Sequence, residues 1–134
     1  MTTKIDHIAI VVEDIDKALQ VYRDALGLPL AAVHEEAVEA VRVAFMPTSQ
    51  GEVELIQPTT ADSGVAKYLA KRGEGLHHIC LEVDSMAECT AKLEAHGMEV
   101  LSKPQINQRG DTYIFVHPRS AHGVLIELYE RARV

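Results

Sequence analysis

The chain has 134 residues, of which 47% are hydrophobic and 25% charged, and its formal net charge is −7. These values are typical of one globular domain with a core of its own. The negative balance argues against a general binder of nucleic acid or of anionic membranes, although a local basic cluster can still hold one anionic small molecule.

The cysteines and the N-terminal stretch argue against several further classes of protein. Cys80 and Cys89 lack CxxC spacing, so they predict neither a disulfide framework nor a cysteine-rich zinc site. The stretch MTTKIDHIAIVVED has no long apolar segment of the kind that a signal peptide carries, and no apolar run approaches the length of a membrane span. We therefore expect a cytoplasmic protein.

The first half of the chain predicts one strand, one helix and three further strands. Residues 4–12 resemble a strand. Residues 15–26 carry apolar side chains at helical spacing, with Asp14 as a plausible N-cap and Gly27 as the end of the helix. The three strands that follow are predicted near 28–34, 40–46 and 52–57.

The second half repeats this order after a short connecting helix at 62–72. The predicted elements are a strand at 76–83, a helix at 85–96, and strands near 98–102, 112–117 and 123–129. The pattern is βαβββ, twice. We therefore predict a single α+β domain over 1–134, built from two tandem modules at about 1–60 and 75–134.

Short stretches of sequence support this duplication. DHIAIVVE aligns with HHICLEVD, which sets His7 against His78, 71 positions later. VELI aligns with IELY, which sets Glu54 against Glu127, 73 positions later. Offsets this similar indicate two copies of one module.

Strand alternation separates the two adjacent histidines of the fifth strand. Successive side chains point to opposite faces, so His77 and His78 cannot have the same role. His77 shares the bulkier face with Ile79, and we expect it at a strand edge. His78 shares the other face with Cys80, as His7 shares its face with Ala9. Of the two histidines, His78 is therefore the candidate for a functional role.

The two aligned glutamates predict a metal site. Glu54 and Glu127 each lie within an apolar strand, where burying a lone carboxylate is costly. Two carboxylates and two imidazoles at equivalent positions would converge if the modules pack as a pseudo-symmetric pair. A divalent cation such as Co, Mn, Ni, Fe or Zn suits these donors. Alone, His7 is more often an ordinary core or surface residue, and Glu54 could lie on a solvated face. The repeat favours the metal site.

The residue pattern resembles the vicinal oxygen chelate superfamily, which has the glyoxalase-like fold, and within it the methylmalonyl-CoA epimerase family. The resemblance runs nearly end to end. It is most specific in IDHIAIVVEDIDKALQVYRDALG, DSGVAKYLAKRGEGLHHICLEVD and HPRSAHGVLIELYE. It implies that the modules form a cupped, half-open mixed β-sheet barrel with the helices outside.

The resemblance also implies an activity and its site. The metal ligands would be His7, Glu54, His78 and Glu127, and they would hold one divalent ion per chain, Co²⁺ first, with Mn²⁺, Ni²⁺, Zn²⁺ or Fe²⁺ as alternatives. The reaction would interconvert the (2R) and (2S) forms of methylmalonyl-CoA through an enolate, with Glu127 also acting as a base. The implied partners are an acyl-CoA thioester and a second copy of the chain, with no nucleic acid or membrane.

Two departures from the family leave questions open. The family's second glutamate lies on the third strand, and the aligned position falls at about Arg42, whereas Glu39 is out of register. The second base therefore stays unassigned. The loop PQINQRGDTY is less glycine-rich than in close relatives, which leaves the preferred acyl group open.

The remaining polar motifs have simpler interpretations. The run from His117 to Gly123 is more typical of a turn shaped by Pro and Gly than of a catalytic loop, although contact with the substrate is the family-based alternative. Cys80 is a small inward side chain with no matched base. Most basic residues belong to solvated faces, but a CoA phosphate needs a cation. The candidates are Lys67, Lys71, Arg72, Lys103, Arg109 and Arg119.

Other activities use the same fold. A glyoxalase I-type lactoylglutathione lyase would use the same four ligands. A ring-cleaving dioxygenase with two His and one carboxylate is less compatible, because a fourth protein ligand fills a position that oxygen needs. A non-catalytic module that binds a small molecule is the third alternative, and the presence of the four ligands argues against it.

Overall fold

The computed structural model describes residues 1–133, which form two compact units. The first unit is His7–His77. The second unit joins Met1–Asp6 to His78–Val134. The unit boundary thus crosses the first strand, and the first six residues belong with the second half of the chain.

The first unit contains one βαβββ module and the connecting helix. Its sheet has the order β2-β3-β4-β1, in which β1 and β4 are parallel and the other pairs are antiparallel. The elements are β1 (Thr2–Val11), α1 (Ile15–Leu19), η1 (Gln20–Ala25), β2 (Ala32–Glu36), β3 (Val41–Thr48), β4 (Gly51–Pro58) and α2 (Gly64–Arg72).

The helix predicted at 15–26 is present, but it is α-helical only in its first part. Asp14 caps it, because its side chain accepts hydrogen bonds from the backbone N–H groups of Asp16 and Lys17. From Gln20 the turns widen into a π-helix, in which the N–H of Leu26 donates to the carbonyl of Val21 at 2.8 Å.

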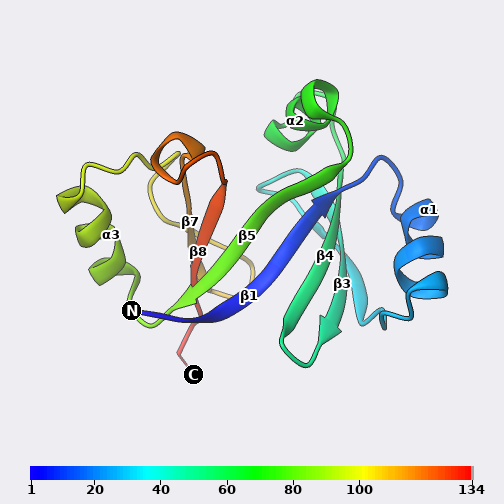
Figure 1. Ribbon diagram of the computed structural model, residues 1–134, viewed down its shortest axis with the longest axis horizontal. Helices are drawn as coiled ribbons and strands as arrows, with labels where there is room; N and C mark the ends of the chain where they lie inside the picture. The colour runs from blue at the N-terminus through cyan, green and yellow to red at the C-terminus, as the bar shows by residue number, and fades with distance from the viewer. Residues whose placement is uncertain (134) are drawn as a thin grey trace. The chain divides into compact units, whose positions relative to one another are not determined.

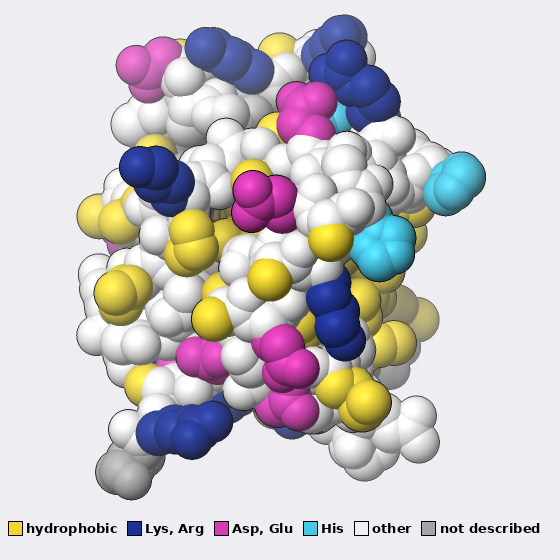
Figure 2. Space-filling model, turned by 90° about the vertical axis from the view of Figure 1, so that its left-hand side faces the viewer, with side chains coloured by type: hydrophobic (Ala, Val, Ile, Leu, Met, Phe, Trp, Pro, Cys, Tyr) yellow, Lys and Arg dark blue, Asp and Glu magenta, His cyan; other side chains and the backbone are white. Residues whose placement is uncertain are grey.

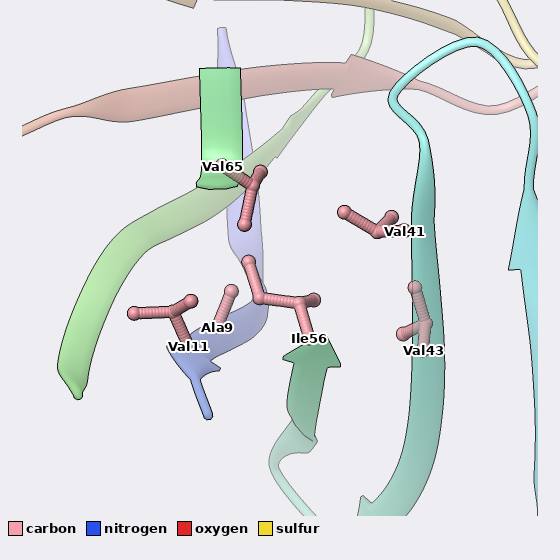
Figure 3. Close-up of a cluster of buried hydrophobic side chains, with 6 residues drawn as sticks. All are labelled: Ala9, Val11, Val41, Val43, Ile56 and Val65. Atoms are coloured by element: carbon pink, nitrogen blue, oxygen red, sulfur yellow. The ribbon is translucent and has the colours of Figure 1, made fainter. Parts of the chain in front are cut away.

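Side chains of the first unit's sheet form a separate core on each face. One core packs against α1 and contains Val12, Ile15, Leu19, Ala44, Met46 and Leu55. The other core contains Ala9, Val11, Val41, Val43, Ile56 and Val65, which point toward one another in Figure 3. Val65 belongs to α2, and we call the sheet face beneath it the α2 face. The predicted alternation of β1 is confirmed, since Ala9 and Val11 lie opposite the side that α1 covers.

The second unit contains the other βαβββ module. Its strands have the order β5-β8-β7-β6, with β5 and β8 parallel. The elements are β5 (Gly75–Val83), α3 (Met86–Ala95), β6 (Gln105–Ile106), β7 (Thr112–Val116), η2 (Pro118–Ser120) and β8 (Ile126–Glu130), and most of them are labelled in Figure 1.

The start of β1 lies beside the end of β5 in the second unit. The hydroxyl of Thr3 donates to the carbonyl of Glu82 at 3.1 Å, and the N–H of Asp84 donates to the carbonyl of Met1 at 3.1 Å. The two stretches therefore run antiparallel.

The second unit also has one core on each face of its sheet. Val83, Met86, Ile114, Val116 and Leu128 form the core on the α3 side. Cys80, Tyr113 and Tyr129 form the other core, with Phe115 packed against it. We call this second side the aromatic face. Leu128 and Tyr129 thus point in opposite directions, as the alternation of β8 predicts.

Three predicted strands differ from the structure. The strand expected at 98–102 is wrong: this segment makes only an isolated bridge from Val100 to Val116, and the regular strand is β6 at Gln105–Ile106. Pro104, which lacks an N–H, separates the two stretches. The strand expected at 28–34 begins only at Ala32, and the strand expected at 123–129 begins only at Ile126.

The surface agrees with the sequence composition. On the face shown in Figure 2, acidic and basic side chains are interspersed and do not gather into one patch of a single sign. Among the described residues, no helix combines the length and the apolar character that a membrane crossing requires.

Candidate functional site

His7 and Glu54 form a largely buried pair in the first unit. Nδ1 of His7 lies 3.0 Å from Oε2 of Glu54, and the two side chains are only 6% and 12% exposed. The parallel register of β1 and β4 sets Ala9 opposite Glu54 and His7 opposite Glu52. The pair is therefore diagonal across two neighbouring strands, on the α2 face.

His78 and Glu127 form the equivalent pair in the second unit. Nε2 of His78 lies 3.0 Å from Oε1 of Glu127, and these side chains are 8% and 9% exposed. The register of β5 and β8 sets Cys80 opposite Glu127, which repeats the relation between Ala9 and Glu54. Each unit thus places one imidazole nitrogen 3.0 Å from one carboxylate oxygen in the same strand register, through Nδ1 of His7 and Nε2 of His78.

The chemistry of each pair fits a divalent metal ion. Imidazole nitrogen and carboxylate oxygen are ligands that Zn²⁺ and similar first-row ions accept. Glu127 is buried and the side chain of Glu54 is 12% exposed, and a carboxylate withdrawn from water requires a compensating charge or hydrogen bonds. A cation shared by an imidazole and a carboxylate provides that charge. The metal-binding role of the four residues remains a prediction.

His77 and His78 face different neighbours, as strand alternation predicts. The ring of His77 contacts Tyr68 of α2 in an edge-on arrangement, with 4.6 Å between the ring centroids. The ring of His78 stands perpendicular to Phe115 of β7, at 5.2 Å. His78 is the one that lies beside a buried carboxylate.

Tyr129, two residues after Glu127 on β8, belongs to the aromatic face and takes part in a polar network. The hydroxyl of Tyr129 donates to Oδ2 of Asp111 at 2.5 Å and accepts from Asn107 Nδ2 at 2.8 Å and Arg109 Nη2 at 3.0 Å. Asn107 Oδ1 accepts from the backbone N–H groups of Arg109 and Asp111. The turn within PQINQRGDTY is therefore fastened to the strand that carries Glu127.

This network shifts the pKa values of its members. Burial raises the pKa of Tyr129 above its ordinary range, and the hydrogen bond to Asp111 adds to the rise. Burial works against the charged form of Asp111, but hydrogen bonds from the N–H of Ala132 and from Tyr129, together with the charge of Arg109, leave the pKa of Asp111 lowered. Sequence reasoning noticed the unusual loop but missed the network, because Tyr129 and Asp111 meet only through strand pairing.

A second ionic cluster lies at the start of β1. Arg131 donates from Nη2 to Oδ1 of Asp6 at 2.5 Å and from Nε to Oε1 of Glu82 at 2.8 Å. Its guanidinium also lies 5.3 Å from the centre of the Tyr129 ring. Arg131 is thus held by two carboxylates, which ties the first residues of the chain to the second unit.

The third strand carries no acid or base on the α2 face. Val41 and Val43 belong to the core there, with Phe45 packed against it. Arg42 alternates to the opposite face and pairs with Glu35 and Gln57.

Other candidate residues have structural roles. Nδ1 of His117 accepts a hydrogen bond from the N–H of Arg119 at 3.0 Å, which caps η2 and favours the turn interpretation of this run. Arg119 also lies 3.7 Å from Glu99. Arg72 lies 5.5 Å from the centre of the Tyr68 ring.

The family model, the relatives and the solved structures that match this chain all belong to related proteins. Residues 6–116 match the family described as the glyoxalase/bleomycin resistance protein/dioxygenase superfamily. The chain is 34% identical to the ethylmalonyl-CoA/methylmalonyl-CoA epimerase of Cereibacter sphaeroides, over 96% of this chain and 98% of that protein.

Two solved structures are similar in fold and in sequence. The methylmalonyl-CoA epimerase of Mycobacterium tuberculosis superimposes with a TM-score of 0.90 at 31% identity, covering 98% of this chain and 90% of that one. A variant of the Streptomyces coelicolor methylmalonyl-CoA epimerase in complex with 2-nitronate-propionyl-CoA gives 0.91 at 35% identity, covering 100% and 98%.

Proposed function

Because the chain belongs to the glyoxalase/bleomycin resistance protein/dioxygenase superfamily, we propose that it is a metal-dependent epimerase that interconverts (2R)- and (2S)-methylmalonyl-CoA. The three relatives described above, which carry this activity in their names, match nearly the whole chain at identities of 31% to 35%. The predicted fold, two tandem βαβββ modules of the glyoxalase type, is confirmed, and so is the resemblance to methylmalonyl-CoA epimerases.

The observation that carries the proposal is the repeated pair of imidazole and carboxylate. We propose that His7, Glu54, His78 and Glu127 together hold one divalent ion, with Co²⁺ as the first candidate. Two nitrogen and two oxygen donors leave further coordination positions for a ligand. When bound, such an ion stabilises the negative charge that develops on the substrate oxygens as the α-proton leaves.

Glu127 is the residue we propose as the first base. Its side chain is only 9% exposed and its carboxylate lies 3.0 Å from His78, so little water surrounds it. A carboxylate in such a place can take the proton from the carbon between the thioester and the carboxylate of the substrate. The electron pair of the broken C–H bond then spreads into the thioester as an enolate. Returning a proton to the opposite side of that carbon inverts it.

Several features of the substrate complex and of the assembly belong to the same proposal. The phosphates of CoA need cations, and Lys71 and Arg72 in the last turn of α2 are candidates. We also propose a homodimer, which the family resemblance implies, and a cytoplasmic location, which the sequence analysis expects. The organisation of residues 1–134 as one functional domain stays a prediction.

Deuterium incorporation at the α-carbon tests the proposed reaction. The metal-loaded protein is incubated in heavy water with each methylmalonyl-CoA enantiomer separately, and the product is analysed for isotope content and configuration. We expect deuterated product of both configurations from either enantiomer. In a parallel reaction, loss of the hemithioacetal of methylglyoxal and glutathione without any α-exchange would identify a lyase instead. Neither reaction, in a protein that takes up no metal, would indicate a binding module.

A further inference from the structure

We infer that Phe115 determines the size of the α-substituent that the site accepts, and that the methyl branch of the substrate lies against its ring. This assignment rests on the proposed function, in which Glu127 removes the α-proton. Phe115 then discriminates between methylmalonyl-CoA and malonyl thioesters with longer branches.

A row of three side chains crosses the sheet of each unit in the same order. In the second unit, β5 and β7 place Cys80 and Phe115 opposite Glu127, one on each side of it. Paired residues on neighbouring strands project from the same face. In the first unit the equivalent row is Ala9, Glu54 and Phe45. The chain contains two phenylalanines, and each is therefore the direct neighbour of one of the two buried-strand glutamates.

The side chains near Glu127 on the aromatic face differ in how much surface they leave open. Cys80 is fully buried, and Tyr113 and Tyr129 are only 6% and 4% exposed. Phe115 packs against these three residues but is itself only partly buried. Its ring therefore provides an apolar surface that a substrate at Glu127 can contact.

Two other rings hold Phe115 in place. The ring of His78 stands perpendicular to it, with 5.2 Å between the ring centroids. The ring of Tyr113 stands at 83° to it, with 6.2 Å between the centroids. Both are edge-to-face contacts at distances that favour aromatic pairs. A ring supported on two sides forms a firm wall, and such a wall can exclude a substituent by its size.

The chemistry of the substrate directs the branch to this wall. A base lies about 3–3.5 Å from the carbon atom that it deprotonates, and a substituent of that atom is about 1.5 Å further, within about 5 Å of the Glu127 carboxylate. Side chains directly opposite in antiparallel strands have Cβ atoms about 4.5–5.5 Å apart, which brings Phe115 into this range. The thioester and the carboxylate of the substrate are polar. The branch is therefore the substituent that gains from contact with an aromatic ring.

Matched leucine substitutions test the assignment. Phe115→Leu makes the side chain beside the proposed base smaller, whereas Phe45→Leu makes the same change beside Glu54, which in our account binds metal only. The kcat/KM for α-proton exchange is measured with methylmalonyl-CoA and with ethylmalonyl-CoA. For Phe115→Leu we expect the ratio of the two values to shift toward ethylmalonyl-CoA by about tenfold or more, the effect of room for one methylene group. Phe45→Leu should keep the ratio within about twofold of wild type.

A larger side chain gives a second measurement in the opposite direction. Phe115→Trp should shift the ratio toward methylmalonyl-CoA, because the indole occupies the space of a longer branch. Equal changes of kcat/KM with both substrates in the two Phe115 variants would indicate a structural role and overturn the assignment. An equal shift of the ratio in Phe45→Leu would also overturn it, because the effect would not be specific to the wall beside Glu127. Absence of exchange in the wild-type protein with either substrate would instead refute the proposed function.

Discussion

His78 and Glu127 are 49 residues apart in the chain, yet their Nε2 and Oε1 atoms lie 3.0 Å apart. His7 and Glu54 repeat this contact in the other unit at the same distance of 3.0 Å. Because β1 with β4 and β5 with β8 are both parallel pairs, the duplicated module brings an imidazole beside a carboxylate twice. The repeat therefore conserves a geometry as well as a sequence pattern.

Replacing each of the two adjacent histidines tests which one binds metal. His78→Ala removes the nitrogen beside Glu127, so we expect loss of bound metal and of epimerase activity. His77→Ala removes only a ring that contacts Tyr68, so metal should stay bound. Metal content of protein purified without chelators, with circular dichroism as a control for folding, measures the difference. Equal metal loss in both variants would show that the sheet face on which each histidine lies does not determine whether it binds the metal.

Glu127→Gln separates metal binding from proton transfer. The amide keeps an oxygen donor of nearly the same shape but cannot accept the α-proton, so we expect some metal to remain. Exchange of the substrate α-proton should fall by about 10²–10⁴-fold. Isotope content of recovered substrate measures this, with metal content determined on the same sample. Wild-type exchange in this variant would remove Glu127 as a base.

Metal binding should stabilise the folded chain. A ligand that binds only the folded state adds about 2.7 kcal/mol to the free energy of unfolding at a hundredfold excess over its dissociation constant. We expect Co²⁺ or Mn²⁺ to raise the melting temperature of the metal-free wild type, and a chelator to reverse the rise. Glu54→Ala should show little response. Glu35→Ala, which changes a carboxylate on the opposite face, serves as the control. An equal rise in both variants would indicate unspecific binding.

The Asp111 carboxylate predicts a pH-dependent contribution to stability. Its pKa is lowered in the folded state, so the stabilisation is complete above the pKa of the unfolded chain, near 3.8, and is lost as the pH falls through the folded value. At pH 7 we expect Asp111→Asn to lower the free energy of unfolding by about 1–3 kcal/mol.

Denaturant titrations of wild type and Asp111→Asn at several pH values provide the measurement. The difference between the two proteins should shrink below the unfolded pKa of an aspartate. A difference that stays constant from pH 7 to pH 3 would show that the charge of Asp111 is not what stabilises the turn. Tyr129→Phe should weaken the same turn, since it removes the hydroxyl that three side chains share.

Much of the fold was predictable from local patterns. The capping residue Asp14 marks the start of the first helix, and the alternation of Ala9 and Val11 with bulkier residues assigns the faces of β1. The duplicated stretches fixed which histidines and glutamates correspond. These signals are local or repeated, so one sequence suffices to detect them.

Other features depend on tertiary contacts or on small differences in backbone geometry. Helical spacing does not distinguish the π-turns of Gln20–Ala25 from α-turns, because the two differ by one residue in the hydrogen-bond partner and no side chain of this segment is buried. The segment at 98–102 has the composition of a strand, yet only Val100 forms a bridge. The hydrogen bond from Tyr129 to Asp111 arises from the pairing of β7 and β8. Neither residue, taken alone in the sequence, indicates this contact.

Anomalous X-ray scattering from crystals of the Co²⁺-loaded protein tests the central claim most directly. We predict one Co²⁺ per chain, with two imidazole nitrogens from His7 and His78 and two carboxylate oxygens from Glu54 and Glu127 at about 2.0–2.2 Å. Separate ions at the two pairs, or a single ion held by other side chains, would contradict it.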